Sequence, residues 1–286
     1  MTVGFKLDID FAGSVAYQRL FGGGSVPVRL KELGVEAVEF PLGPASDLDE
    51  VAAAAHQCRR VGLLVSFHPY TEGHNANPAH FVGPGSYPAS VHERFFELAA
   101  GLSRDQGETI VNVHPAAATA DRASRVELRE RSVDFFSWAN GWCAEHSSDV
   151  RPVAELQVAP DEGEGLIRIG DTPEELAQVV ERSGVGACWD VGHSEWNNRR
   201  FGTNRHPTEQ LWKRIVHVHC HDVDDEGDHR VLRRGDTHWR RFLQDLAGTD
   251  YAGTVVIEVA PETFLEVGGP QALEESIAAV TEAASN

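Results

Sequence analysis

The side chains best suited to chemistry stand where short apolar segments of the sequence end. Segments such as VAELQV, CWDVGH, HVHCHD and VVIEVA carry acidic residues and histidines among β-branched residues. The residues concerned are His68, His114, Glu155, Asp190, His193, His219 and Glu258. A buried charge is costly unless it is paired or bound to a metal ion. The pattern therefore predicts a metal site.

Four consecutive apolar segments supply the predicted ligands, which are Glu155, Asp190, His219 and Glu258. Singly, each has an ordinary explanation, because a buried glutamate often pairs with an arginine and a histidine often forms a structural hydrogen bond. As a set they favour one divalent ion. Three carboxylates and one imidazole suit Mn²⁺ best, with Co²⁺ and Mg²⁺ as alternatives, and two more histidines, His68 and His114, would favour Zn²⁺.

Other histidines and a tryptophan near these segments allow more than one role. His217, His219 and His221 alternate and so share one strand face, but alternate residues lie about 6.6 Å apart and cannot all reach one ion. We expect His219 to be the ligand, His217 to lie deeper and His221 to face the substrate. Trp189 either lines the pocket or packs structurally. Three histidines in expected helices, His56, His92 and His146, are expected to be solvated.

The elements that must position these residues alternate along the chain. The predicted strands are Val3–Ile9, Ala37–Phe40, Leu63–His68, Thr109–His114, Val153–Val158, Ala187–Asp190, Ile215–His221 and Thr254–Val259. The predicted helices are Asp47–Val61, Pro88–Leu102, Arg122–His146, Thr172–Ser183, Pro207–Arg214, Thr237–Leu246 and Pro270–Ala284. Such alternation implies parallel strands joined by right-handed crossovers. Eight units predict an α/β fold, a (β/α)8 TIM barrel with residues 1–286 as a single domain, whose chemistry lies at the C-terminal strand ends.

The connections between these elements are expected to choose the substrate, above all residues 71–87, 160–171 and 194–206. Gly22-Gly23-Gly24 reads as a flexible turn, because no GK[ST] follows it and no GxGxxG follows the first strand. The sequence therefore predicts no nucleotide-phosphate loop.

Composition narrows the partners and the compartment. The net charge of -19 and the pI near 5.1 disfavour nucleic acid and anionic membranes. Four cysteines without CxxC pairing suit a reducing compartment, and neither a signal peptide nor an 18-residue apolar run is present. A cytoplasmic protein is the expectation, with no membrane partner.

The motifs WDVGH, HVHCHD and VVIEV resemble the xylose isomerase-like TIM barrel superfamily over essentially the whole chain. That superfamily includes sugar phosphate isomerases and epimerases, inosose dehydratases and nucleases of the endonuclease IV type. In its keto-sugar 3-epimerases the four matching positions hold one Mn²⁺-like ion, the two glutamates exchange protons, and the D-x-x-H histidine, here His193, contacts the substrate. Two features depart from them: the stretch DVDDEGDHR offers only Arg230 as a substrate-binding candidate, and no Asn follows Glu155.

The nuclease branch matches other positions. The three-zinc site of these nucleases uses three histidines, matched in this sequence by His68, His114 and His193, and a D-x-H pair that follows them. His229 fits the second half of that pair, but Gly227 stands where its Asp should be, and Asp236-Thr237-His238 also reads D-x-H.

Together these features predict a metal-dependent isomerase or epimerase acting on a sugar-like hydroxy-ketone. A proton would move through an enediolate that the ion stabilises, with Glu155 and Glu258 as proton carriers. The substrate contacts would be His68, His114, Trp189, His193, His221 and Arg230. An inosose-type dehydratase, a metal-dependent hydrolase or phosphodiesterase, and a barrel that only binds a small ligand stay open, as does a homo-oligomer.

Overall fold

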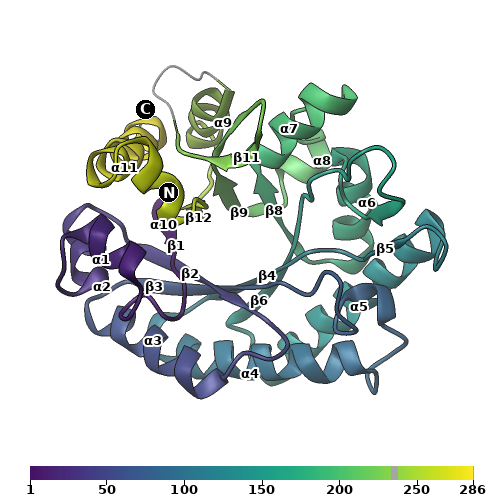
Figure 1. Cartoon of the computed structure of the whole chain (residues 1–286). Helices are drawn as coiled ribbons and strands as arrows, with labels where there is room; N and C mark the ends of the chain where they lie inside the picture. The colour runs from purple at the N-terminus through teal and green to yellow at the C-terminus, as the bar shows by residue number, and fades with distance from the viewer. Residues whose placement is uncertain (233–237, 286) are drawn as a thin grey trace. The chain divides into compact units, whose positions relative to one another are not determined.

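The computed structural model describes residues 1–232 and 238–285. Each of the eight predicted strands is present: β1 (Thr2–Lys6), β2 (Ala37–Leu42), β3 (Leu64–Pro69), β4 (Thr109–Val113), β6 (Val150–Glu155), β8 (Gly186–Asp190), β9 (Ile215–Cys220) and β12 (Thr254–Ile257) (Figure 1). They form a closed parallel barrel in the order β1-β12-β9-β8-β6-β4-β3-β2. The predicted (β/α)8 class is confirmed.

The helices follow the strands in the expected alternation. They are α1 (Val15–Phe21), α2 (Val26–Glu32), α3 (Leu48–Arg60), η1 (Pro78–His80), α4 (Tyr87–Gln106), α5 (Arg125–His146), α6 (Pro173–Ser183), α7 (Val191–Phe201), α8 (Glu209–Trp212), α9 (His238–Ala247), α10 (Pro261–Val267) and α11 (Pro270–Ser285). Of the helix predicted for Thr237–Leu246, Thr237 lies outside the described residues. Among those described, no helix is both long and apolar enough to cross a membrane.

By its internal contacts the chain divides into two compact units. Unit 1 comprises residues 1–41, 47–65 and 218–286, and unit 2 comprises residues 42–46 and 66–217. That residues 1–286 form one domain stays a prediction. In unit 1, β1 pairs in parallel with β2 and β12, and Phe5 packs on Phe264 with ring centroids 6.1 Å apart. Two further strands, β10 (Asp222–Asp224) and β11 (Gly227–Arg230), form an antiparallel pair.

In unit 2, β4 pairs in parallel with β3 and β6, and β6 pairs with β8. Helix α5 packs on α6 and begins with a capping box, in which Ser124 and Glu127 satisfy each other's backbone N–H groups. Two short strands, β5 (Ala117–Thr119) and β7 (Leu166–Arg168), form an antiparallel pair. These capped helices and paired strands fix the ends of β3, β4, β6 and β8, where the predicted site residues stand.

Two predictions about unit 2 are wrong. The connection 194–206 is largely helical, because α7 starts at Val191 directly after β8 with no intervening loop residue. Asp190 ends the strand and also caps the helix, so no separate capping residue in the sequence marks the start of α7. His92 is fully buried rather than solvated, and its ring packs against Phe135 with centroids 4.7 Å apart.

Candidate metal centre

Three histidines surround a buried glutamate at the ends of neighbouring strands of unit 2. The pairing of Asn112 with Val153 and of Val113 with Ala154 sets the next pair along, His114 and Glu155, side by side. The Nε2 atoms of His68 and His114 lie 3.2 and 3.4 Å from the Glu155 carboxylate, which is completely buried. Asn112 donates a hydrogen bond from its side-chain amide to the same carboxylate. Two histidines predicted from sequence therefore share one carboxylate.

The tautomer of His68 follows from its other contact. Its Nδ1 lies 2.8 Å from the backbone carbonyl of Asn112, an oxygen that can only accept, so Nδ1 carries the proton. The Nε2 atom of a neutral ring then directs a lone pair at Glu155. That contact is attractive only when a second proton or a cation lies at Nε2. This donor set fits a cation at the Glu155 carboxylate.

Asp190 and His193 are held by one helix start. The Oδ1 atom of Asp190 accepts the backbone N–H of His193 at 2.7 Å, which caps α7. The Nδ1 atom of His193 lies 2.9 Å from the carbonyl of Leu156 and donates to it, so Nε2 keeps the lone pair. The same Nδ1 lies 3.4 Å from Asp190 Oδ2 and 3.6 Å from Glu155 Oε1. The D-x-x-H motif thus builds the helix cap and joins Glu155 in one cluster.

In unit 1, a buried histidine lies between two buried carboxylates. The Nε2 atom of His219 lies 2.6 Å from Glu39 Oε1, and its Nδ1 atom lies 2.8 Å from Glu258 Oε2. A neutral imidazole has one N–H and can donate to only one of these carboxylates. The second contact needs another proton or a cation at that nitrogen. A metal-bound histidine whose other nitrogen is oriented by a carboxylate has this arrangement, so these residues also fit a metal ion.

Lys6 sets the electrostatics around Glu258. Its Nζ atom lies 3.2 Å from Glu258 Oε1, and the β1 register also pairs Lys6 with Glu39. Burial by itself would raise the pKa of Glu258. The charges of His219 and Lys6, together with that of His229, outweigh burial and hold this pKa well below 4.5. Glu258 is therefore a carboxylate at neutral pH.

The remaining candidates of unit 1 form a second small group. His229 donates its backbone N–H to His221 Nδ1 at 2.9 Å, and the two rings stack with centroids 4.1 Å apart. Burial lowers the pKa of His221, so this ring is neutral. His229 has a φ of 52°, a left-handed conformation that is uncommon outside glycine, and its Nδ1 lies 3.0 Å from the Glu258 carbonyl. Arg230 forms an ion pair with Asp224 at 3.0 Å, so its structural partner is clear.

Six of the predicted site residues thus belong to unit 2 and four to unit 1. Those of unit 2 are His68, His114, Glu155, Trp189, Asp190 and His193, and those of unit 1 are His219, His221, Arg230 and Glu258. Trp189 and His217 are fully buried. In Asp236-Thr237-His238, the first two residues lie outside the described residues. That Glu155, Asp190, His219 and Glu258 hold one ion stays a prediction.

Three residues of these clusters escaped the sequence interpretation: Lys6, Glu39 and Asn112. Each is polar within an apolar strand, in VGFK, AVEFPL and IVNVHP. Two features of the sequence point to two of them: Lys6 is one of three lysines in the chain, and Glu39 is a charged residue between Val38 and Phe40. None of the three is a metal-ligand type at the end of a predicted strand, which is the pattern that marks the other site residues.

The chain belongs to the xylose isomerase-like TIM barrel family, whose model matches residues 28–283. No curated protein matches it. Among solved structures, D-psicose 3-epimerase with D-tagatose from Clostridium cellulolyticum H10 is 14% identical, with a TM-score of 0.66 and coverage of 100% of this chain and 98% of that one. L-ribulose 3-epimerase is 15% identical (TM-score 0.65, coverage 100% and 95%). An AP endonuclease, family 2, from Brucella melitensis is 16% identical (TM-score 0.64, coverage 99% and 99%). At such low sequence identities, these structural similarities show a shared fold and not a shared activity.

Proposed function

We propose that the protein is a divalent-metal-dependent isomerase or epimerase of small sugar-like hydroxy-ketones, with Glu155, Asp190, His219 and Glu258 as metal ligands. The observation that carries the proposal is His219, whose two ring nitrogens both face carboxylates within 2.8 Å. In unit 2, His68 also directs a ring nitrogen, Nε2, at a buried carboxylate, that of Glu155, at 3.2 Å. All four proposed ligands are buried and of types that bind divalent ions.

Glu155 and Glu258 are the proposed proton carriers. A bound divalent ion would polarise neighbouring hydroxyl and carbonyl oxygens of the substrate. This would acidify the C–H bond of the hydroxyl-bearing carbon next to the carbonyl. One glutamate takes that proton, and the other returns a proton to the opposite face or to the neighbouring carbon. The low pKa of Glu258 keeps it ready as a base. His193 and His221 are the proposed substrate contacts, and Trp189 would form part of the pocket wall.

The family resemblance and the mixed oxygen and nitrogen ligand set favour Mn²⁺, with Zn²⁺, Co²⁺ and Mg²⁺ as alternatives. The near variant of this chemistry is loss of water from the same type of intermediate, as in an inosose dehydratase. Four buried thiols suit the reducing cytoplasm as the place of action.

The test is to incubate the metal-loaded enzyme with candidate ketoses and inososes in D2O. Deuterium at the carbon next to the carbonyl is the expected result, together with one metal ion per chain by elemental analysis. Glu155→Gln, measured at equal metal occupancy, should lose this exchange. Cleavage of a phosphodiester without any exchange would contradict the proposal.

A metal-dependent hydrolase is the second candidate, and one observation favours it. His68 and His114 both place Nε2 within 3.4 Å of Glu155, which offers ligands for an additional ion. Two or three zinc ions per chain would support this candidate and contradict the one-metal proposal. The net charge of -19 makes a nucleic acid an unfavourable substrate for it.

A further inference from the structure

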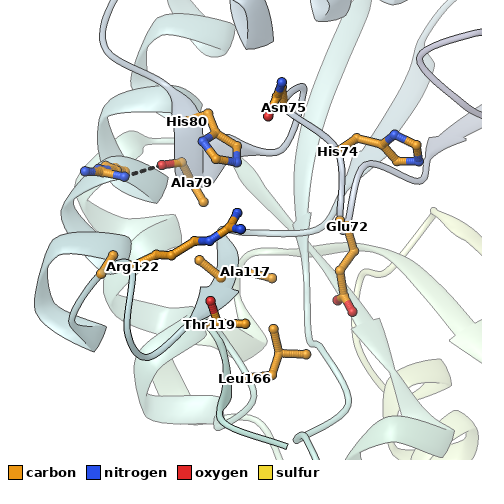
Figure 2. A pocket seen from close by; sticks show the side chains of 13 residues that line it. Glu72, His74, Asn75, Ala79, His80, Ala117, Thr119, Arg122 and Leu166 are labelled. Carbon is orange, nitrogen blue, oxygen red and sulfur yellow. Dashed lines mark hydrogen bonds between the residues drawn. The ribbon is translucent and has the colours of Figure 1, made fainter.

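A pocket with a volume of about 290 Å³ lies within unit 2, apart from the residues assigned above. Its walls come from the segment after β3, from η1, from the β5–β7 pair and from the residues leading into α5 (Figure 2). Thr119 and Leu166, on paired strands, form part of one wall. Because part of the wall is formed by the hydrogen-bonded strands β5 and β7, backbone pairing holds that part of the pocket in place.

Two arginines of this pocket have no carboxylate partner within 4 Å in the described part of the chain. The Arg122 side chain forms no hydrogen bond there, and in the view of Figure 2 its guanidinium lies between His80 and Ala117. Arg131 donates one hydrogen bond, to the carbonyl of Ala79, which leaves most of its N–H groups available. By contrast, Arg125, Arg168 and Arg182 each hold carboxylates.

The pKa of His80, which lines the pocket, is affected by the positive charges of the two arginines. Burial lowers its pKa, and the positive charges of Arg131 and Arg122 lower it further. Both guanidinium groups therefore act on the same imidazole, which lines the same pocket. A positive region of this kind stands out in a chain with 44 acidic and 25 basic residues.

The acidic residues nearby offset only part of this charge. A side-chain hydrogen bond to Thr119 is the largest cause of the lowered pKa of Asp121, and the charge of Arg122 is the smallest. The cap of α5 is likewise the largest cause of the lowered pKa of Glu127, and the charge of Arg131 is the smallest. Both carboxylate oxygens of Glu72, on the pocket wall, lie 2.8 Å from nitrogens of Arg168. Burial would raise the pKa of Glu72, but Arg168, with a smaller contribution from His114, lowers it. The Glu127 carboxylate accepts from Ser124 N and Ser124 Oγ at 2.8 Å, within the cap of α5.

The pocket adjoins the Glu155 cluster along the chain. Glu72 is four residues after His68, and Ala117 is three residues after His114. Four residues span at most about 14 Å even when fully extended. The pocket wall and the histidines of the Glu155 cluster are therefore near one another within unit 2.

We propose that this pocket binds the anionic group, a phosphate or a carboxylate, of a small polyol ligand through Arg122 and Arg131. Arginine presents several N–H groups in a planar fork that matches the oxygens of either anion. That the other end of the ligand reaches Glu155 rests on the proposed function, whereas the anion site does not. The substrate class becomes a sugar-like hydroxy-ketone that carries an acidic group.

The experiment is calorimetric titration of the full chain with glycerol 3-phosphate and with glycerate. These two probes share a three-carbon polyol and differ in their anion, so the preferred one identifies the group. Arg122→Gln should weaken binding of the preferred probe by about tenfold or more, as expected for loss of a hydrogen bond to a charged group. Arg131→Gln should weaken it similarly. The matched control is Arg94→Gln, an exposed arginine of α4 outside the pocket, which should bind like the wild type.

Two controls separate this site from the metal centre and from misfolding. Treatment with a chelator should leave the probe affinity unchanged, because neither arginine is a metal ligand. Arg122→Gln should melt at the wild-type temperature, because this side chain forms no hydrogen bond in the described residues. Equal binding by wild type and Arg122→Gln, no binding of either probe, or binding that disappears with the chelator would each overturn the proposal.

Discussion

The carboxylates at the centre of the two clusters face different kinds of base. Glu155 in unit 2 has three histidines within 3.6 Å, whereas Glu258 in unit 1 has a lysine at 3.2 Å as well as His219. A lysine keeps its charge throughout the physiological pH range, while a histidine gains or loses a proton within it. The unit 1 cluster thus contains a permanent positive charge, whereas the bases within 3.6 Å of Glu155 in the unit 2 cluster are histidines.

The largest effects are expected from the two glutamates themselves. Glu155→Gln and Glu258→Gln should each lower the rate of deuterium exchange by about 10²–10⁴-fold, the range for loss of a general acid or base. Metal occupancy is measured in each variant, because both residues are also proposed ligands. Only Glu258→Gln removes the partner of Lys6, so it should also lower the melting temperature more. A variant that exchanges at the wild-type rate with full metal occupancy would contradict the proton-carrier roles.

His92, a buried histidine outside both clusters, should make its own contribution to the loss of stability in acid. Removing it separates that contribution from the contribution of the clusters. Burial lowers the pKa of His92 from 6.5 to about 4, although its hydrogen bond to the Pro88 carbonyl opposes this. Below pH 6.5 the unfolded chain binds this proton and the folded chain does not. The folded state should therefore lose up to about 3 kcal/mol as the pH falls to about 4.

His92→Gln should remove this loss, so its free energy of unfolding should gain on the wild type as the pH falls. Urea unfolding at both ends of this range measures the change. His56→Gln, at an exposed histidine of α3, is the matched control and should follow the wild type. A His92→Gln variant with the same pH dependence as the wild type would show that acid acts through the clusters instead.

Glu39 tests whether the unit 1 cluster orients its histidine. Glu39→Gln keeps the size of the side chain but weakens its hydrogen bond to His219 Nε2. The affinity for Mn²⁺ should fall by about 10–100-fold, as for other carboxylates that orient a metal-binding histidine. Titration calorimetry with Mn²⁺ measures this change directly. Glu36→Gln, an exposed residue just before the same strand, should bind Mn²⁺ like the wild type. Unchanged affinity in Glu39→Gln would leave Glu39 with a structural role alone.

Lys6→Met should have the smallest effect and removes the permanent charge that distinguishes the two clusters. The depressed pKa of Glu258 contributes stability above its unfolded pKa of about 4.5, and this contribution disappears as the pH falls through its folded pKa. Loss of the partly exposed pair should cost about 1 kcal/mol at neutral pH. The difference between Lys6→Met and wild type should shrink in acid, as measured by urea unfolding. A difference that stays constant with pH would mean that Lys6 contributes by packing.

The strands and their terminal residues were predictable because local patterns specify them. Short runs of Val and Ile mark the strands, and His68, Glu155 and Asp190 stand out against them. Their neighbours are fixed by register between strands that are distant in sequence. Lys6 meets Glu258 across 252 residues and His219 meets Glu39 across 180, and no local pattern encodes either pair.

The sequence around His92 does indicate a buried position, contrary to the prediction that it is solvated. His92 stands three and four residues before Phe95 and Phe96, on the apolar face of α4. Residue type alone suggested a solvated histidine, whereas the helical spacing placed it in the core. The missed start of α7 has a different cause, because Asp190 belongs to a strand and to a helix cap at the same position.

This double role of Asp190 has an evolutionary consequence. A change to a residue that cannot accept this hydrogen bond costs the first turn of α7 its cap, whatever happens to the reaction. Natural selection for folding alone would therefore retain a capping residue here, aspartate, asparagine, serine or threonine, in a lineage that had lost its catalytic activity. In surveys of related genomes, a capping residue at this position would mark the architecture, and the glutamates of β6 and of the segment after β12, the proposed proton carriers, would be the better indicators of catalytic activity.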